Sequence, residues 1–243
     1  MTPVIDFHTH ILPGMDDGAQ SVEMAVEMLT MLRAQGVTMV FATSHYTPHR
    51  ESVESFVARR EEAYARLMKH LGSDRFPEIR LGAEIYIEKG ISERDLRPLY
   101  LEGTKALLME FPREPFRDWM TGEVENVMYS QPATPVIAHL DRYLSWFRRA
   151  EIEAVLSLED TVFQINAEAF ADRAGKKFVY ELYKQGVPLV FGSDAHNTAG
   201  RAPQMQRIAD AARKKKIPWM NYAGETAGRY GLLGGDNPTA FSG

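Results

Sequence analysis

Histidine and acidic residues occur together in short motifs along this chain. The densest is Asp6-Phe7-His8-Thr9-His10, where the alternation of a strand would put both histidines on the same side. The same residue types recur in Thr43-Ser44-His45, Gly82-Ala83-Glu84, Glu110-Phe111-Pro112, Ala138-His139 and Ser193-Asp194-Ala195-His196. The chain has no cysteine. Imidazole and carboxylate ligands without thiolate suit Mn, Fe or Zn and fit Mg or Ca poorly, so the motifs indicate a site for one of the first three metals.

Taken singly, each motif is weak, because a histidine after a strand more often serves as a hydrogen-bonding residue than as a ligand. Crowded together without a cation, however, these groups would suffer both repulsion and desolvation. Divalent ions relieve that cost. Two such ions roughly 3.5–4 Å apart can share a hydroxide near neutral pH, which supplies the nucleophile that a chain without cysteine otherwise lacks.

The charge of the filled site points to an anionic substrate. Four carboxylates are candidate ligands: Asp17, Glu84, Glu110 and Asp194. With three divalent ions the site would carry a local charge of +2, and the net charge of the chain would move from −5 to +1. Arg142 and Arg201 follow two of the predicted strands and are candidates to bind the anion. Surface ion pairing is the alternative role for both arginines.

The elements that position these residues alternate between short β-rich runs and longer amphipathic stretches. Strands are predicted at 4–7, 38–43, 79–83, 106–109, 135–138, 162–165 and 189–191. Helices are predicted at 21–35, 53–71, 119–129, 152–158, 178–185 and 203–215. Seven strands alternating with helices favour an α/β fold with a closed or nearly closed parallel barrel, although periodicity alone leaves an open sheet as an alternative. In a barrel the motifs would gather at the C-terminal ends of the strands.

Length and composition favour one globular domain covering residues 1–243. No apolar run approaches the roughly 20 residues that span a bilayer, and no signal pattern opens the chain, so a cytoplasmic protein without membrane insertion is expected. The net charge of −5 argues against a nucleic-acid partner. The basic run at 213–216 is expected to end a helix. From Gly224 the chain is rich in glycine, which predicts a flexible tail or a strap across the surface.

In order, these motifs resemble the PHP (polymerase and histidinol phosphatase) superfamily, and more closely its bacterial branch of capsule-biosynthesis protein-tyrosine phosphatases. The resemblance covers nearly the whole chain. It rests on the six motifs above together with the segments Pro13-Gly14, Asp16-Asp17-Gly18, Arg142-Tyr143 and Gln164-Ile165-Asn166-Ala167, and Asn197 after the last motif. The Pro-Gly-x-Asp-Asp-Gly segment looks more like this branch than like the histidinol phosphatases.

The resemblance implies a distorted parallel (β/α)7 barrel, similar to a TIM barrel, with three divalent ions, preferably Mn. By matching motif, the first ion would be held by His8, His10, Glu84 and Asp194, the second by Glu84, Glu110 and His139, and the third by Asp17, His45 and His196. Arg142 and Arg201 would bind phosphate.

The chain departs from this branch in two places. Leu140-Asp141 stands where Pro-Glu is usual, and Ser44 and Tyr46 flank His45 where Pro and His are common. His49 is either a compensating polar group near the entrance or an ordinary loop residue. Neither departure removes a ligand, but both affect the mouth of the pocket and therefore the substrate.

We therefore expect phosphomonoester hydrolysis by a metal-bridging hydroxide. The resemblance suggests a phosphotyrosine substrate on a tyrosine autokinase that governs capsular or exopolysaccharide export. Three alternatives stay open: a phosphatase of a small metabolite such as histidinol phosphate, a nuclease or nucleotide phosphoesterase, and a non-catalytic metal-stabilised binding domain.

Overall fold

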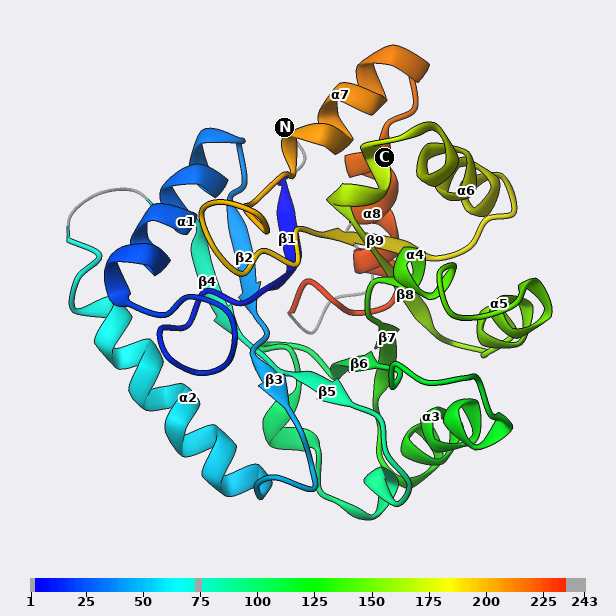
Figure 1. The fold of residues 1–243 in the computed structure, drawn as a ribbon, viewed down its shortest axis with the longest axis horizontal. Coiled ribbons are helices and arrows are strands. Elements are labelled where there is room, and N and C mark those ends of the chain that lie inside the picture. The colour runs from blue at the N-terminus through cyan, green and yellow to red at the C-terminus, as the bar shows by residue number, and fades with distance from the viewer. Residues whose placement is uncertain (1–2, 73–75, 235–243) are drawn as a thin grey trace.

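The strands of the chain run parallel and lie at the centre of the molecule, with helices around them (Figure 1). A computed structural model describes residues 3–72 and 76–234. The strands in these ranges are β1 (Ile5–Thr9), β2 (Met39–Ala42), β3 (His45–Tyr46), β4 (Glu78–Leu81), β5 (Glu84–Tyr86), β6 (Ala106–Glu110), β7 (Thr134–Ile137), β8 (Val162–Asn166) and β9 (Leu189–Gly192). They form two sheets, in the orders β1-β2-β4 and β3-β5-β6-β7-β8-β9. The predicted parallel α/β architecture is confirmed.

Two of the seven predicted strands end early, and each is followed by a short strand that was not predicted. The runs predicted at 38–43 and 79–83 end early, at Ala42 and Leu81, and the chain resumes pairing in β3 and β5. Gly82 lies in the second break, where an added Cβ would be 2.6 Å from Leu101 Cδ2. At each break the polypeptide passes from the first sheet to the second. There His45 pairs in register with Glu84. Two candidate ligands are thereby brought side by side.

The two sheets also meet along β1 and β9. The amide of Asp194 donates to the carbonyl of His8 at 2.7 Å, and the amide of His10 donates to the carbonyl of Ala195 at 2.9 Å. Thr9 and Ala195 form an isolated parallel bridge. The strands are thus arranged as a distorted barrel, but their ladders form two sheets and not one closed cylinder.

The peripheral helices follow the predicted order, with shifted ends. They are α1 (Val22–Ala34), α2 (Val53–Met68), α3 (Asp118–Ser130), α5 (Arg149–Leu156), α6 (Arg173–Lys184) and α7 (Gln206–Lys215). In α1 the Ser21 hydroxyl accepts from the amide of Met24, and Ala25, Met28 and Leu32 are buried on one face. The basic run at 213–216 lies at the end of α7. None of the helices in the described ranges combines the length and apolar character that crossing a bilayer requires.

Several elements are absent from the prediction. They are α4 (Leu140–Tyr143), the 3-10 turns η1 (Ile91–Glu93), η2 (Arg97–Leu99) and η3 (Ala167–Phe170), and α8 (Trp219–Arg229). Residues 224–229 of the segment predicted as a flexible tail or a surface strap belong to α8. Burial of Trp219, Ala223 and Ala227 on one face of this helix outweighs the cost of its glycines. Residues 235–243 of the predicted tail lie outside the described residues.

Candidate metal centre

Four predicted ligands of the first ion converge on one point. His8 Nε2 lies 3.1 Å from Glu84 Oε2 and 3.6 Å from Asp194 Oδ1. His10 Nε2 lies 3.2 Å from the same Glu84 oxygen and 3.5 Å from the same Asp194 oxygen. All four side chains are buried, so the convergence of β1, β5 and the loop after β9 creates a closed pocket of nitrogen and oxygen ligands.

The predicted second group shares Glu84 with the first. His139 Nε2 lies 2.9 Å from Glu84 Oε1 and 3.3 Å from Glu110 Oε1. His45 also approaches this group, because its Nδ1 is 3.0 Å from Glu84 Oε2 and 4.0 Å from Glu110 Oε2. His45, Glu84 and Glu110 can together present ligand atoms to one ion. Glu84 therefore occupies the bridging position between the two groups.

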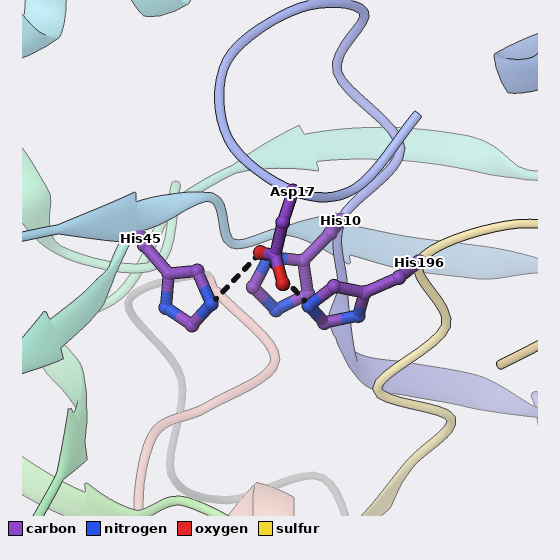
Figure 2. A group of neighbouring side chains, drawn as sticks. All are labelled: His10, Asp17, His45 and His196. Atoms are coloured by element: carbon purple, nitrogen blue, oxygen red, sulfur yellow. Dashed lines mark ion pairs between the residues drawn. The ribbon is translucent and has the colours of Figure 1, made fainter. Parts of the chain in front are cut away.

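The predicted third group lies at the mouth of the pocket. Asp17 Oδ1 is 3.4 Å from Nε2 of both His45 and His196, and Figure 2 shows the carboxylate between the two rings. His10 lies behind them, with its ring centroid 3.8 Å from that of His196. These four residues can hold one ion. The Asp17 side chain is 66% exposed, so this group is the one that faces solvent.

The histidines are oriented with their lone pairs toward the cluster. Nδ1 of His10 lies 2.8 Å from the Asp16 carboxylate, and Nδ1 of His196 lies 3.0 Å from the Asp194 carbonyl. Both partners can only accept, so Nδ1 must carry the proton and Nε2 is free for a metal. Among the residues that the structure describes, Nε2 of His196 and Oε2 of Glu84 are buried and find no hydrogen-bond partner. Buried polar atoms without a protein partner are consistent with ligands of a cation.

The ionisation of the cluster is strongly perturbed. Burial alone would lower the pKa of His139, but hydrogen bonds to Glu110 and Glu84 raise that pKa to about 9. Burial and the charge of His10 lower the pKa of His196 to about 3. Burial would raise the pKa of Glu84, but the surrounding imidazoles hold it well below its usual range. The cluster thus stabilises anionic carboxylates together with positive charge, as a cation site requires.

Two candidate ligands have strained backbones. His139 has φ 32° and Asp194 has φ 49°, both in the left-handed region that residues other than glycine seldom adopt. Each lies one or two residues beyond the end of a strand. Conformations of this kind persist where the surroundings impose them, and they concentrate at functional sites.

Asp16 is a site residue to which the sequence motifs assigned no role. Its carboxylate accepts from His10 Nδ1 at 2.8 Å and from the amide of His45 at 2.8 Å, so it orients ligands of two groups. Gly18 is required beside it, because an added Cβ would lie 2.3 Å from the carbonyl of His10. The Asp16-Asp17-Gly18 motif pointed to two adjacent carboxylates. The fold shows that Asp16 positions histidines, whereas Asp17 is the predicted ligand.

Gln164 and Asn166 also belong to a sequence motif without an assigned role. Gln164 Oε1 accepts from the amide of His139 at 2.7 Å and lies 3.0 Å from His8 Nδ1. Because the backbone N–H settles which amide atom is the oxygen, His8 must donate from Nδ1 and keep Nε2 free. Gln164 Nε2 donates to Asn166 Oδ1, and Asn166 Nδ2 donates to Asp194 Oδ2 at 3.1 Å. Two side chains of β8 therefore connect three candidate ligands.

Both predicted phosphate ligands lie beside the first group. Arg142 and Arg201 form ion pairs with different oxygens of Asp194, and both line a cavity of about 170 Å³. Arg201 is also 3.7 Å from Asp17, so the two guanidinium groups flank the cluster on one side. The convergence of two cations on a cavity next to the candidate ligands fits an anion site.

The departures from the family pattern have separate structural roles. Tyr46 is buried and packs edge-on against Phe56, with ring centroids 5.4 Å apart, so it belongs to the core and not to the entrance. Asp141 accepts from the amide of Asn166 at 2.8 Å, and its burial raises its pKa to about 6. His49 is exposed and lies 2.7 Å from Glu88.

A family described as capsular polysaccharide synthesis, CpsB/CapC, matches residues 4–220 of this chain. The chain belongs to the CpsB/CapC family. It is similar to tyrosine-protein phosphatase YwqE of Bacillus subtilis, with 30% identity over 233 residues that cover 89% of this chain and 88% of the relative. It is equally similar to tyrosine-protein phosphatase CpsB of Streptococcus pneumoniae, with 30% identity over alignments covering 87% and 90% of the two chains.

Solved structures agree with the CpsB/CapC assignment at the level of the fold. The structure reported for the metal-dependent tyrosine phosphatases YwqE and CpsB superposes with a TM-score of 0.76 at 24% identity, over 97% of this chain and 98% of that one. Histidinol phosphate phosphatase from Lactococcus lactis, solved with zinc, L-histidinol and phosphate, has a TM-score of 0.55 at 14% identity, over 87% and 93% of the two chains. The expected PHP-type fold is confirmed.

Proposed function

We propose that this protein is a metal-dependent protein-tyrosine phosphatase that removes phosphate from phosphotyrosine on a protein. The observation that carries the proposal is the convergence of His and carboxylate ligands on a cavity flanked by Arg142 and Arg201. The relatives named as tyrosine-protein phosphatases align over 88% and 90% of their own lengths, so the similarity extends over nearly the whole enzyme.

The proposal includes three divalent ions, with Mn as the preferred metal and Fe or Zn as alternatives. The ligands are those assigned by resemblance, and the distances support each group. His45 belongs to the third group and lies beside the second, because its Nε2 faces Asp17 and its Nδ1 faces Glu84. Glu84 joins the first two groups through its two oxygens.

Bound divalent ions supply Lewis acidity, which lowers the pKa of a coordinated water and neutralises charge on a phosphoryl group. The protein's part is orientation and electrostatics. Asp16 and Gln164 hold His10 and His8 with their Nε2 lone pairs toward the cluster. Arg142 and Arg201 bind the phosphate oxygens and stabilise the charge that the equatorial oxygens carry in the transition state.

The proposed physiological substrate is a phosphorylated tyrosine autokinase of capsular or exopolysaccharide biosynthesis. The family description and the names of the relatives support this choice. A single phosphoesterase domain over residues 1–243 and a cytoplasmic location belong to the same proposal. Histidinol phosphate and nucleotides are the substrates against which it must be tested.

The decisive experiment compares steady-state hydrolysis of a phosphotyrosine peptide, histidinol phosphate and a short oligonucleotide in the presence of Mn. We expect the peptide to be the best substrate and His8→Ala to abolish turnover, because His8 contributes to the most buried ligand group. Retained activity in His8→Ala, or unchanged turnover after EDTA treatment, would contradict the metal mechanism. Preference for histidinol phosphate or the oligonucleotide would contradict the substrate.

A further inference from the structure

A groove of about 390 Å³ lies beyond the ends of β5 and β6, apart from the cavity of the two arginines. The chain after these strands and the start of α3 line it. Its principal residues are Tyr86, Lys89, Pro112, Glu114, Arg117 and Trp119. None of these is among the candidate metal ligands or phosphate ligands.

The groove lies beside one candidate ligand of the metal centre, Glu110. Tyr86 pairs in register with Glu110 in the parallel ladder of β5 and β6, and the amide of Ile87 donates to the carbonyl of Glu110 at 2.9 Å. Pro112 follows Glu110 by two residues. The groove therefore begins at the strand ends that present a candidate ligand.

The lining combines aromatic surface with cations that are available to a ligand. The Lys89 ammonium lies 5.7 Å from the centroid of the Trp119 ring, and both Lys89 and Arg117 are exposed. Glu88, at the edge of the groove, accepts from His49 at 2.7 Å. No ion pair is found for Lys89 or Arg117 within residues 3–72 and 76–234. The lining thus carries two cations without an ion pair in the described residues and two carboxylates, of which Glu88 is hydrogen-bonded to His49 and Glu114 is not.

We propose that this groove binds the polypeptide segment that flanks the phosphotyrosine and favours acidic residues in that segment. The proposal rests on the proposed function, since it requires a protein substrate. A metabolite-sized phosphomonoester bound between the cluster and the arginines would leave the groove empty. A tyrosine within a polypeptide carries neighbouring residues, and an open groove that starts beside Glu110 accommodates them. Aromatic rings contribute sequence-tolerant contact area, and the cations contribute the preference for acid.

The test uses the charge-reversed double variant Lys89→Glu/Arg117→Glu in the metal-loaded full-length enzyme. The substrates are two phosphotyrosine peptides, one flanked by glutamates and one by lysines, and p-nitrophenyl phosphate, which has no flanking residues. We expect KM for the acidic peptide to rise about five- to tenfold at low salt, while kcat changes little. The constants for p-nitrophenyl phosphate should stay at wild-type values, because the groove is outside the phosphate site.

A matched control is Lys177→Glu/Arg213→Glu, which makes the same change of charge on exposed side chains of α6 and α7. We expect this control to leave KM for all three substrates unchanged. Equal KM values for the acidic peptide in the groove variant and in wild type would overturn the groove proposal while the proposed phosphatase activity stands. The groove proposal would also be overturned if KM for the acidic peptide rose as much in the control variant as in the groove variant. Absence of phosphotyrosine hydrolysis by wild type would overturn both proposals.

Discussion

Replacing Gln164 with leucine removes one acceptor that two candidate ligands share. In the wild-type protein its Oε1 accepts from the amide of His139 and from Nδ1 of His8. Leucine is similar in size but cannot accept a hydrogen bond. The substitution therefore leaves the core filled while it removes the group that fixes the tautomer of His8 and the strained backbone of His139.

The magnitude follows from the groups left unpaired. Two buried donors lose their acceptor, and each unsatisfied donor costs roughly 1–3 kcal/mol, so the free energy of unfolding of the metal-free protein should fall by about 2–6 kcal/mol. His8 then loses its preferred ring orientation and tautomer. Loss of such a partner typically costs about 10–100-fold in metal affinity.

The measurement is calorimetric titration of EDTA-stripped protein with MnCl2, together with metal analysis and urea unfolding. Gln164→Glu is the comparison variant. Its carboxylate keeps both acceptor contacts and loses only the hydrogen bond to Asn166, so its metal affinity should be higher than that of Gln164→Leu. Manganese affinity in Gln164→Leu equal to wild type would refute the reasoning. An equal loss in both variants would also refute it, since the lost bond to Asn166, and not the lost acceptor, would then explain the effect.

Three further predictions concern packing, phosphate binding and metal-dependent stability. Gly192→Ala should lower the free energy of unfolding in urea by about 1–3 kcal/mol. The added Cβ would lie 2.6 Å from His8 Cβ and 2.8 Å from Gln164 Nε2. A change below about 0.5 kcal/mol would show that the strand moves freely. Arg201→Ala should raise KM or lower kcat for a phosphotyrosine peptide while bound metal stays constant, and loss of metal would contradict its role as a phosphate ligand. Adding Mn at about 100 times its Kd to stripped protein should stabilise it by about 2.7 kcal/mol, or roughly 5–11 °C in Tm by calorimetry; an unchanged Tm would contradict metal binding to the folded state.

Much of the fold was predictable because hydrophobic periodicity is a local property. The stripe of Met28, Leu29 and Leu32 identifies α1, and each predicted strand overlaps an observed strand. The short strands after the breaks at Ala42 and Leu81 were not predictable, since Thr43-Ser44-His45 and Gly82-Ala83-Glu84 have no strand periodicity and their pairing depends on the transfer of each segment to the second sheet. Helix α8 was missed because its glycines conceal an apolar face that is stabilised only by packing against the sheet.

By itself, the sequence determined the types of residue available for chemistry and their order along the chain. Histidines and carboxylates follow short apolar runs, cysteine is absent, and these facts limit the chemistry to metals with nitrogen and oxygen ligands. Only the tertiary structure decided which groups meet. The separation of Asp16 as a positioning residue from Asp17 as a candidate ligand depends on which carboxylate faces His10 Nδ1. The resemblance already assigned Glu84 to two ions, and the structure adds the strand break that sets it opposite His45. Distances between side chains arise from backbone paths that bring remote segments together, and these paths are set by packing across the whole molecule.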